Sequence, residues 1–383
     1  MNIEDLDRAE QRFAAATDMT VGLEEEFSLL DPDSLDLVPR YEELRAAADL
    51  DPVLGDGVAG ELISSEIEVI SGEGANFADA VQRQRERRGL MFALADTHGV
   101  ALGATGTHPW ADYRCQPIID TEHYRRVEEG LKYVAWRNNT FSLHVHAGVR
   151  GIDRAVQVCD RLRPVLPQLL AVSANSPYLD GRDSGLHSTR TQSFTKSFPR
   201  CGIPDHFGGW GAYRSYIEFL LQTRSIVEFT QVWWSVRPHF SFGTVEVRIC
   251  DAQATAGESE ALATLILACI AQALRYVDEG VPFDPPAPRL VEENMWRAIR
   301  FGLDGKLIDL QAAEEFPARA AIERLLAWSE PARSELGLSE PVFPERNGAQ
   351  RQRAMIAAGA SREEVFAASV AETARTYPQE VPV

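Results

Sequence analysis

Basic residues are scarce in this sequence of 383 amino acids. Its 38 lysines and arginines are outnumbered by 57 aspartates and glutamates, which gives a formal net charge of -19. A protein that binds the backbone of a nucleic acid needs a basic surface, so this composition argues against nucleic acid as the main partner. It does not exclude a small anion such as a nucleotide, because a few arginines and a Mg²⁺ ion can hold one.

Cysteine and long apolar runs are scarce as well. The five cysteines, at positions 115, 159, 201, 250 and 269, form no CxxC pair, and the acidic N-terminus has no apolar signal-peptide core. We therefore expect reduced thiols and a cytoplasmic protein. The longest apolar stretch, 261–274, falls short of the roughly 20 residues that a membrane span needs. We predict a buried helix there and no association with a membrane.

The common nucleotide-binding motifs are missing too. No GxxxxGK[ST] segment is present, so a nucleotide would have to be bound without a P-loop. Residues 55–60 fit GxGxxG, but a strand-like segment follows them. A dinucleotide site needs a strand, a turn and then the N-terminus of a helix at the pyrophosphate. We therefore do not expect a Rossmann fold.

Helical and strand-like segments are interspersed without a repeat. Helices do not alternate one-for-one with strands, which favours an α+β fold with a largely antiparallel sheet. The proline-rich stretch 281–288 suggests a helical lead-in (1–17), a catalytic domain (18–280) and a C-terminal helical segment (281–383) packed on the same domain. The predicted helices are 76–98, 121–137, 152–173 (split near Pro164 and Pro167), 257–278, 290–300 and one that begins at the capping box Ser361 to Glu364.

Four strand-like segments carry paired charged or imidazole side chains. Because side chains alternate between the faces of a strand, each pair shares one face and apolar residues take the other. Neighbouring carboxylates on a mostly buried strand repel each other and lose hydration, which a divalent cation offsets. The pattern predicts one sheet with an apolar back and a metal-binding front. The pairs are Glu24 with Glu26, Glu66 with Glu68, His144 with His146, and Glu246 with Arg248.

Seven motifs occur in a fixed order: Gly22-Leu-Glu-Glu-Glu-Phe27, the segment from Glu61 to Glu68, Gly106-Thr-His-Pro109, His144-Val-His146, Ser173-Ala-Asn-Ser-Pro177, Gly243-Thr-Val-Glu-Val-Arg-Ile-Cys-Asp251 and Asn294-Met-Trp-Arg-Ala-Ile-Arg-Phe-Gly302. No single motif is specific. Together they resemble the carboxylate-amine ligase (YbdK-like) branch of the glutamate–cysteine ligase type 2 family. The resemblance covers nearly the whole chain.

The resemblance implies a fold and a reaction. The fold is glutamine-synthetase-like, with a curved antiparallel sheet that forms an active-site funnel and is backed by helices. The reaction is the ATP-dependent joining of a carboxylate to an amine. Glutamate and cysteine are the default substrates, and γ-glutamyl phosphate is the intermediate. Another amino acid, a polyamine or a small amine could replace cysteine.

The resemblance also implies metal ligands. Glu24, Glu61 and Glu68 would hold one Mg²⁺ ion, with Glu61 in the loop that enters its strand. The second ion would be held by Glu26, His144 and Glu246. A histidine among Mg²⁺ ligands is unusual, which leaves Mn²⁺ as a substitute. Glu66 shares a face with Glu68, but the resemblance does not point to it.

Arginines complete the expected site. Arg248 lies beside Glu246, Arg190 would contact the substrate carboxylate or the γ-phosphate, and Arg237 is a third catalytic candidate. His108, His146 and Arg248 are the candidates for nucleotide contacts. His108 could instead be a turn residue, and His146 could orient a metal ligand in place of binding the metal. For Glu25, on the opposite face of its strand, we expect a structural salt bridge.

Two other function classes compete with the ligase. His144 and His146 form the HxH dyad of many zinc hydrolases, and His187, His206, His239 or Asp251 could complete such a site. The many glutamates argue against it, because one zinc ion does not need them. A non-catalytic binding protein would retain buried carboxylates at a cost in stability. The exposed edges of an open sheet make a homodimer reasonable.

Overall fold

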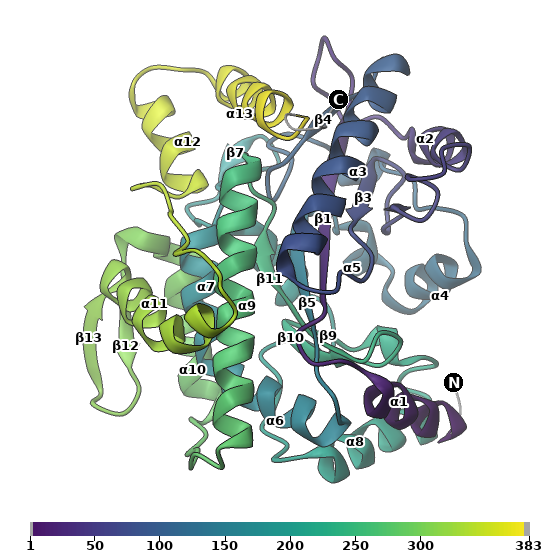
Figure 1. Cartoon of the computed structure of the whole chain (residues 1–383). Helices are drawn as coiled ribbons and strands as arrows, with labels where there is room; N and C mark the ends of the chain where they lie inside the picture. The colour runs from purple at the N-terminus through teal and green to yellow at the C-terminus, as the bar shows by residue number, and fades with distance from the viewer. Residues whose placement is uncertain (1–2, 379–383) are drawn as a thin grey trace.

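A largely antiparallel sheet forms the centre of the protein (Figure 1). The computed structural model describes residues 3–378. Within them, six strands follow the order β10-β11-β5-β1-β3-β2, a seventh, β4, pairs with β1, and all of these pairs are antiparallel. The predicted α+β class is confirmed. The strands are β1 (Val21–Leu30), β2 (Val58–Ala59), β3 (Glu66–Ile70), β4 (Ala101–Gly103), β5 (Ser142–Gly148), β10 (Val236–His239) and β11 (Thr244–Asp251).

Three two-stranded sheets lie outside the central one. The pairs β6–β7 and β12–β13 are antiparallel, and β8–β9 is parallel. Residues 55–60 form turns and the start of β2, and no helix follows them directly, so they do not form a dinucleotide site. The additional strands are β6 (Tyr178–Leu179), β7 (Arg182–Asp183), β8 (Cys201–Gly202), β9 (Trp233–Trp234), β12 (Lys306–Asp309) and β13 (Glu314–Pro317).

The predicted helices are present, with one interruption more than expected. Lys132, with φ of 49°, separates α4 from α5 in the expected helix 121–137. The expected break near Pro164 is a 3₁₀ turn between α6 and α7. The helices are α1 (Ile3–Ala15), α2 (Tyr41–Ala48), α3 (Phe77–Thr97), α4 (Glu122–Leu131), α5 (Tyr133–Trp136), α6 (Ile152–Leu162), α7 (Leu166–Ser173), α8 (Trp210–Gln222), α9 (Ala256–Asp278), α10 (Pro288–Phe301), α11 (Ala318–Glu335), α12 (Gly348–Ala357) and α13 (Arg362–Thr376).

Helix ends follow the capping signals in the sequence. The side chain of Asn76 accepts a hydrogen bond from the backbone N–H of Asp79 and begins α3. Ser361 and Glu364 bond each other's backbone N–H groups at the start of α13, as the capping box predicts. These caps satisfy backbone donors that have no partner inside the helix.

The apolar back of the sheet is covered by helices. Helix α9 packs on β5, α6 and α7 pack on β10 and β11, and α3 packs on β1 and β3. Leu23, Val145 and Val247, which alternate with the charged residues, are almost fully buried in this layer. Helix α9 is long and apolar enough to cross a membrane, but 72% of its apolar window is buried inside the protein. This helix is therefore part of the core, as predicted.

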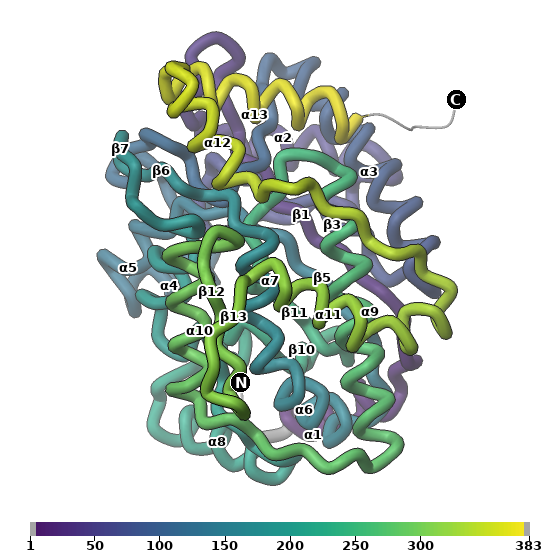
Figure 2. The backbone as a smooth tube through the Cα atoms, turned by 90° about the vertical axis from the view of Figure 1, so that its left-hand side faces the viewer, coloured from purple at the N-terminus to yellow at the C-terminus, as the bar shows by residue number. Residues whose placement is uncertain are grey.

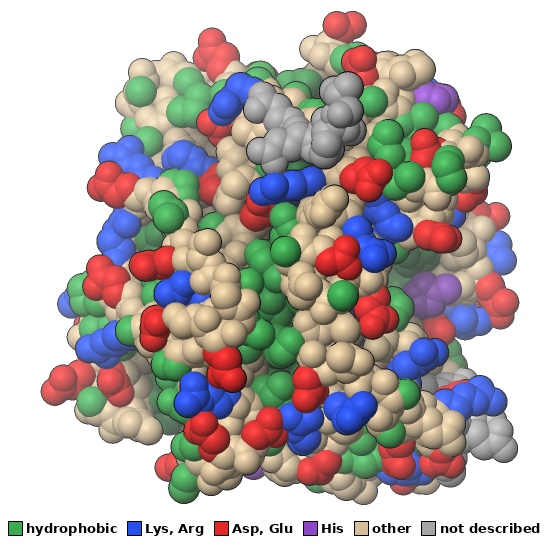
Figure 3. Space-filling view, viewed as in Figure 1, with side chains coloured by type: hydrophobic (Ala, Val, Ile, Leu, Met, Phe, Trp, Pro, Cys, Tyr) green, Lys and Arg blue, Asp and Glu red, His purple; other side chains and the backbone are tan. Residues whose placement is uncertain are grey.

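The C-terminal helices pack against the same body. Helix α10 contacts α7, α11 contacts α9 and α7, and α13 contacts β4 and α9. Figure 2 shows α12 and α13 at one end of the molecule and α1 and α8 at the other. On the face drawn in Figure 3, acidic and basic side chains are intermixed and no broad basic patch is visible.

One charged residue of β1 points into the back layer. The carboxylate of Glu25 accepts hydrogen bonds from Gln84 Nε2 at 2.8 Å, from Arg88 Nη1 at 3.2 Å and from Ser259 Oγ. Arg88 also bonds Glu260 at 2.9 Å. This network joins β1 to α3 and α9, and it agrees with the structural salt bridge expected for Glu25.

We expect Arg88→Ala to lower the free energy of unfolding by about 3–5 kcal/mol, because it leaves the carboxylate of Glu25 buried without its cation. Urea unfolding followed by circular dichroism measures this. Arg83→Ala is the matched control on the same helix, since Arg83 forms an exposed pair with Asp79 that solvent screens, and its loss should change stability much less than the loss of Arg88. Equal effects of the two substitutions would contradict the structural role of Glu25.

Candidate functional site

The register of the sheet brings the paired residues of four strands together. Glu26 lies opposite Glu68, Glu24 lies opposite His144, and Glu246 lies opposite His146. Directly opposite residues of antiparallel strands have their Cβ atoms about 5 Å apart. Charges that are more than 200 positions apart in sequence therefore form a single group on the front of the sheet. We call Glu24, Glu26, Glu68, His144, His146 and Glu246 the charged row.

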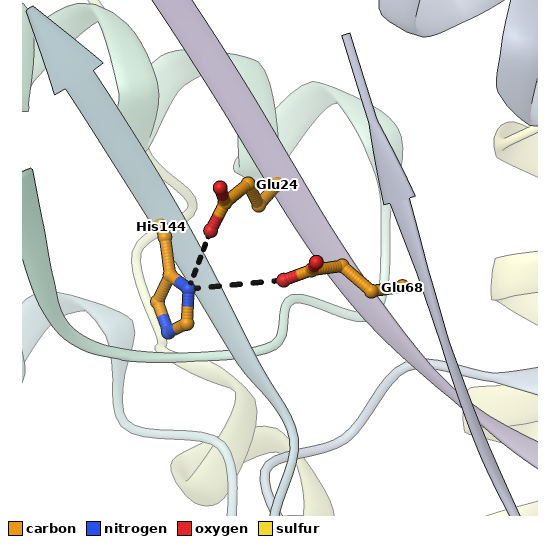
Figure 4. Close-up of side chains that lie close together, drawn as sticks. All are labelled: Glu24, Glu68 and His144. Atoms are coloured by element: carbon orange, nitrogen blue, oxygen red, sulfur yellow. Dashed lines mark hydrogen bonds and ion pairs between the residues drawn. The ribbon is translucent and has the colours of Figure 1, made fainter. Parts of the chain in front are cut away.

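Glu24 lies at the centre of the charged row. Its Oε2 is 2.9 Å from His144 Nδ1, and its Oε1 is 3.1 Å from His146 Nε2. Glu68 Oε1 lies 3.9 Å from His144 Nδ1. Figure 4 shows Glu24, Glu68 and His144 pointing toward one another from β1, β3 and β5. The expectation that these side chains share one face of the sheet therefore holds in the structure.

Hydroxyl and backbone groups hold the row in position. The backbone N–H of Ser142 donates to Glu26 Oε2 at 2.5 Å, and Ser142 Oγ lies 2.8 Å from His144 Nε2. Thr244 Oγ1 lies 2.9 Å from His146 Nδ1, so the other ring nitrogen of His146 faces the carboxylates. The sequence interpretation missed Ser142 and Thr244. The alternation of β5 and β11 was the available signal, because it places both on the same face as the row.

The carboxylates fall into two electrostatic classes. Burial alone would raise the pKa of Glu246, but the guanidinium groups of Arg237 and Arg248 hold it well below its ordinary value. The pKa of Glu24 is likewise held low, against burial, by His146 and His144. Burial and neighbouring carboxylates raise the pKa of Glu61 to about 8. The pKa values of Glu66 and Glu68 are also raised, for the same two reasons. One half of the site is thus short of positive charge.

The ligand atoms fit divalent cations. In the described part of the chain, three groups have ligand atoms within 4.8 Å of one another, and all are rich in the carboxylate oxygens that Mg²⁺ prefers. Glu68 Oε1 is buried without a hydrogen-bond partner, and His146 Nε2 is buried with a 3.1 Å contact to Glu24, as expected of atoms that a cation would contact. The groups are Glu24, Glu68 and His144; Glu24, His146 and Glu246; and Glu26, Glu61 and Glu68.

These groups differ from the sets that the resemblance implied. Glu61 lies with Glu26 and Glu68 in the structure, whereas the resemblance implied a group of Glu61 with Glu24 and Glu68. Glu246 joins Glu24 and His146, and not Glu26 and His144. The reason is the register, which places His146 and not His144 opposite Glu246. His146 therefore lies among the candidate ligands, whereas the sequence favoured an orienting role for it.

The geometry does not favour a zinc hydrolase. No cation group among the described residues contains both His144 and His146. His187 lies near Asp304, and His206 lies near Asp160. Asp251 accepts hydrogen bonds from Ser176, Ser188 and the backbone of Asn175. His239 stacks on Phe242, and burial above all lowers its pKa to about 3.

The three candidate arginines converge beside the row. Arg237 Nε donates to Glu246 Oε2 at 2.5 Å, and Arg248 donates to the other oxygen of Glu246. Arg190 donates to the backbone carbonyls of Ile249 and Arg248 at 3.1 and 3.2 Å. All three line one pocket of about 790 Å³, which we call the arginine pocket.

The arginine pocket combines cations, acids and apolar walls. It reaches the row at Glu26 and is also lined by Glu61 and Glu66. Glu66 received less weight from the sequence, yet its Oε1 is buried without a hydrogen-bond partner. The apolar wall comes from a π-helical turn (Thr191–Thr195), a following loop and β9, and it consists of Phe194, Phe198 and Trp233.

A second pocket reaches the row at Glu24 and His146. Its volume is about 630 Å³, and its lining is mostly apolar, so we call it the apolar pocket. Gly22 contributes to this space, since a Cβ there would lie 3.3 Å from the Cβ of His146. The other lining residues are Arg12, Thr20, Val21, Leu23, Ile70, Gly72, Glu73, Ser241, Phe242 and Thr244.

His108 lies apart from both pockets, so the structure does not support the expected nucleotide contact. Its Nε2 lies 2.8 Å from the carbonyl of Leu35, and its Nδ1 accepts from the backbone N–H groups of Trp110 and Ala111. Burial lowers the pKa of His108 to about 4. Its ring also packs on Phe366, so both nitrogens and the ring are used in local packing, as in the turn alternative.

Comparison with known proteins decides the family. The chain matches the family model of glutamate-cysteine ligase family 2 (GCS2) over residues 20–372. The chain belongs to this family. The predicted family is thereby confirmed, and the protein is a ligase of the glutamate–cysteine ligase type.

Similar sequences and solved structures of similar fold come from several bacteria. A relative from Solibacter usitatus named "Putative glutamate--cysteine ligase 2" is 38% identical over 87% of this chain and 88% of its own. One from Rubrobacter xylanophilus is 38% identical over 88% and 87%. A glutamate–cysteine ligase from Francisella tularensis, solved in complex with AMP, has a TM-score of 0.68, 11% identity and coverage of 95% and 91%. A bifunctional glutathione synthetase from Pasteurella multocida has a TM-score of 0.71, 13% identity and coverage of 97% and 54%.

Without metal, we expect the stability of this ligase to fall between about pH 5 and about pH 8. Glu61 keeps its proton up to about pH 8 in the folded chain, whereas an ordinary glutamate releases it near 4.5. The folded state therefore binds more protons than the unfolded state over this window, and the free energy of unfolding decreases as the pH rises. Thermal melting in EDTA at several pH values measures the slope.

Glu61→Gln should flatten part of this slope, because the amide does not titrate. Mg²⁺ should raise the melting temperature of the wild type at about pH 8 more than that of the variant. Glu43→Gln is the control, since Glu43 is exposed and its pKa is lowered to about 2 by Arg40 and His98, below this window. Parallel pH profiles for the wild type and Glu61→Gln would rule out the raised pKa.

Proposed function

We propose that this ligase joins the γ-carboxylate of glutamate to the amine of cysteine at the expense of ATP, in the cytoplasm. The observation that carries the proposal is a row of carboxylates and imidazoles that can serve as cation ligands, reached by one pocket at Glu26 and by another at Glu24 and His146. Family membership supports the glutamate–cysteine pair, and the AMP complex of the Francisella tularensis relative supports a nucleotide. Another small amine remains the alternative acceptor.

Mg²⁺ is the cation that suits this donor set best, with Mn²⁺ as a substitute because imidazoles take part. Glu24, Glu68 and His144, Glu24 with His146 and Glu246, and Glu26 with Glu61 and Glu68 would hold the ions. When bound, the ions neutralise phosphate and carboxylate charge and so reduce the repulsion between two anionic reactants.

The reaction has two balanced steps. The γ-carboxylate of glutamate attacks the γ-phosphorus of ATP, the bond from that phosphorus to the bridging oxygen breaks, and ADP leaves. The cysteine nitrogen then attacks the acyl carbon of γ-glutamyl phosphate, phosphate leaves, and the nitrogen loses a proton. Both steps place negative charge on phosphoryl oxygens, which preorganised arginine donors stabilise.

The arginine pocket suits the amino-acid substrates. Arg190, Arg237 and Arg248 supply fork-shaped donors for a carboxylate and for the transferred phosphoryl group. The acids Glu61 and Glu66 and the wall of Phe194, Phe198 and Trp233 can surround an amine with an apolar side chain. Positive and negative groups in one pocket match the zwitterionic form of an amino acid.

The apolar pocket suits the base of the nucleotide. Glycines and aliphatic side chains line it, and the half-exposed ring of Phe242 offers a surface for stacking. The phosphates would then point toward Glu24 and His146, where the pocket meets the charged row. The nucleotide would approach the row at Glu24 and His146, and the amino acids would approach it at Glu26. A homodimer is retained as part of the proposal, from the open edges of the sheet.

The deciding experiment is phosphate release from ATP with Mg²⁺ and glutamate, with and without cysteine. Release that rises with both amino acids, together with γ-glutamylcysteine in the mass spectrum, supports the proposed reaction. Release with glutamate alone keeps the first step and redirects the search to other amines. No release with any acid and amine, together with tightly bound Zn²⁺, would overturn the ligase chemistry.

Glu24→Gln should reduce phosphate release more than about 100-fold, beyond the loss typical for a residue that only supports a metal ligand. Glu24 belongs to two of the three candidate cation groups, so its loss weakens both. Glu43→Gln, an exposed carboxylate, is the control. Circular dichroism shows whether the variant is folded, and Mg²⁺ should no longer raise its melting temperature as in the wild type. Full activity of a folded Glu24→Gln protein would exclude Glu24 as a ligand.

A further inference from the structure

Helix α1 lies outside the region that matches the family model, which starts at residue 20. It is nevertheless packed firmly against the body of the protein. Leu6, Ala9 and Phe13 are buried in the main core. Glu10 accepts hydrogen bonds from Trp210 Nε1 at 2.5 Å and from Arg214 at 2.6 Å, both on α8. Figure 1 shows α1 beside α8, near the start of β1.

The turn between β10 and β11 accepts α1 at close range. Gly243 has φ of 71°, and a Cβ there would lie 3.2 Å from the backbone oxygen of Arg12 and 3.3 Å from Arg12 Cγ. A larger residue would therefore be strained in its backbone and would press on α1. Gly243 belongs to the same motif as Glu246 and Arg248, so the strand that carries these residues also fixes the last turn of α1.

Arg12 extends from this last turn into the lining of the apolar pocket. Apart from His146 it is the one basic side chain among the described residues that line that pocket. It is exposed, and no ion pair to Arg12 is found in the described part of the chain. Arg8 lies one turn earlier on the same helix. It pairs with Asp5 at 2.8 Å, and it does not line the apolar pocket.

We propose that α1 is a wall of the nucleotide pocket and that Arg12 binds the phosphate of ATP that lies nearest to the ribose. This inference rests on the proposed function, because it takes the apolar pocket as the nucleotide site. Within the apolar pocket, the candidate cation ligands of the charged row are Glu24 and His146. The phosphate nearer to the ribose lies farther from that row and needs another cation. A guanidinium group suits this contact because it donates in a fork to phosphate oxygens.

The test compares Arg12→Ala with Arg8→Ala in the full chain, with Mg²⁺ present. Dissociation constants for ATP and ADP come from calorimetry, and adenosine is measured by its competition with ATP. Arg12→Ala should weaken ATP and ADP about tenfold, the size expected for one charge-assisted contact at a partly exposed site. It should leave adenosine unchanged. Arg8→Ala should bind all three as the wild type does, and Arg12→Lys should retain part of the affinity.

The outcomes separate this inference from the proposed function. If the wild type binds no ATP, the proposed function fails and the phosphate contact fails with it. If the wild type binds ATP and Arg12→Ala binds it equally well, only the role of Arg12 is overturned. An equal loss for ATP and adenosine would also overturn it, because that pattern indicates packing of α1 and not a phosphate contact.

Discussion

Like charges gathered on one face of a buried sheet are the constraint on which the rest of the structure depends. Protein cations neutralise only part of the charged row, since Arg237, Arg248 and His146 surround Glu246 and Glu24. At Glu61 and Glu68, burial and repulsion between carboxylates outweigh the attraction of Arg248, so the pKa values of both are raised. This half of the site is stable either with protons or with external cations. A cation bound in this half of the site would therefore neutralise carboxylates that the protein itself leaves uncompensated.

Packing on the back of the sheet stabilises the strands that carry the charged row. Apolar residues that alternate with the row pack on α3, α6 and α9. Their burial offsets the free-energy cost of burying charged residues on the front of the sheet. Glu25 is the exception, and its bonds to Arg88 and Ser259 tie β1 to two of these helices. The ligands therefore project from paired strands that are held from behind. Such a support limits the movement of the carboxylates when a cation or substrate arrives.

The period of two along a strand was enough to predict which side chains share the front, whereas Glu61, in the preceding loop, was indicated only by the family resemblance. The grouping around cations was not predictable, because it depends on long-range register and on the bulge between Val247 and Cys250. For His108 the sequence left a nucleotide contact and a turn role open, for a similar reason. Its partner Leu35 lies 73 positions away in sequence, and no local pattern reveals such a contact. Local alternation thus determines faces, whereas tertiary pairing determines neighbours.

The two pockets depend on different parts of the chain. Strands β1, β3, β5 and β11 provide the row itself, whereas Phe194, Phe198 and Trp233 in the wall of the arginine pocket come from a π-helical turn, a loop and β9. The apolar pocket is lined by the first residues of β1, by the β10–β11 turn and by helix α1. Substitutions in these surrounding segments can change which amine or nucleotide is bound without altering the carboxylates. The sheet thus fixes the charged row, and the segments packed around it shape the two pockets.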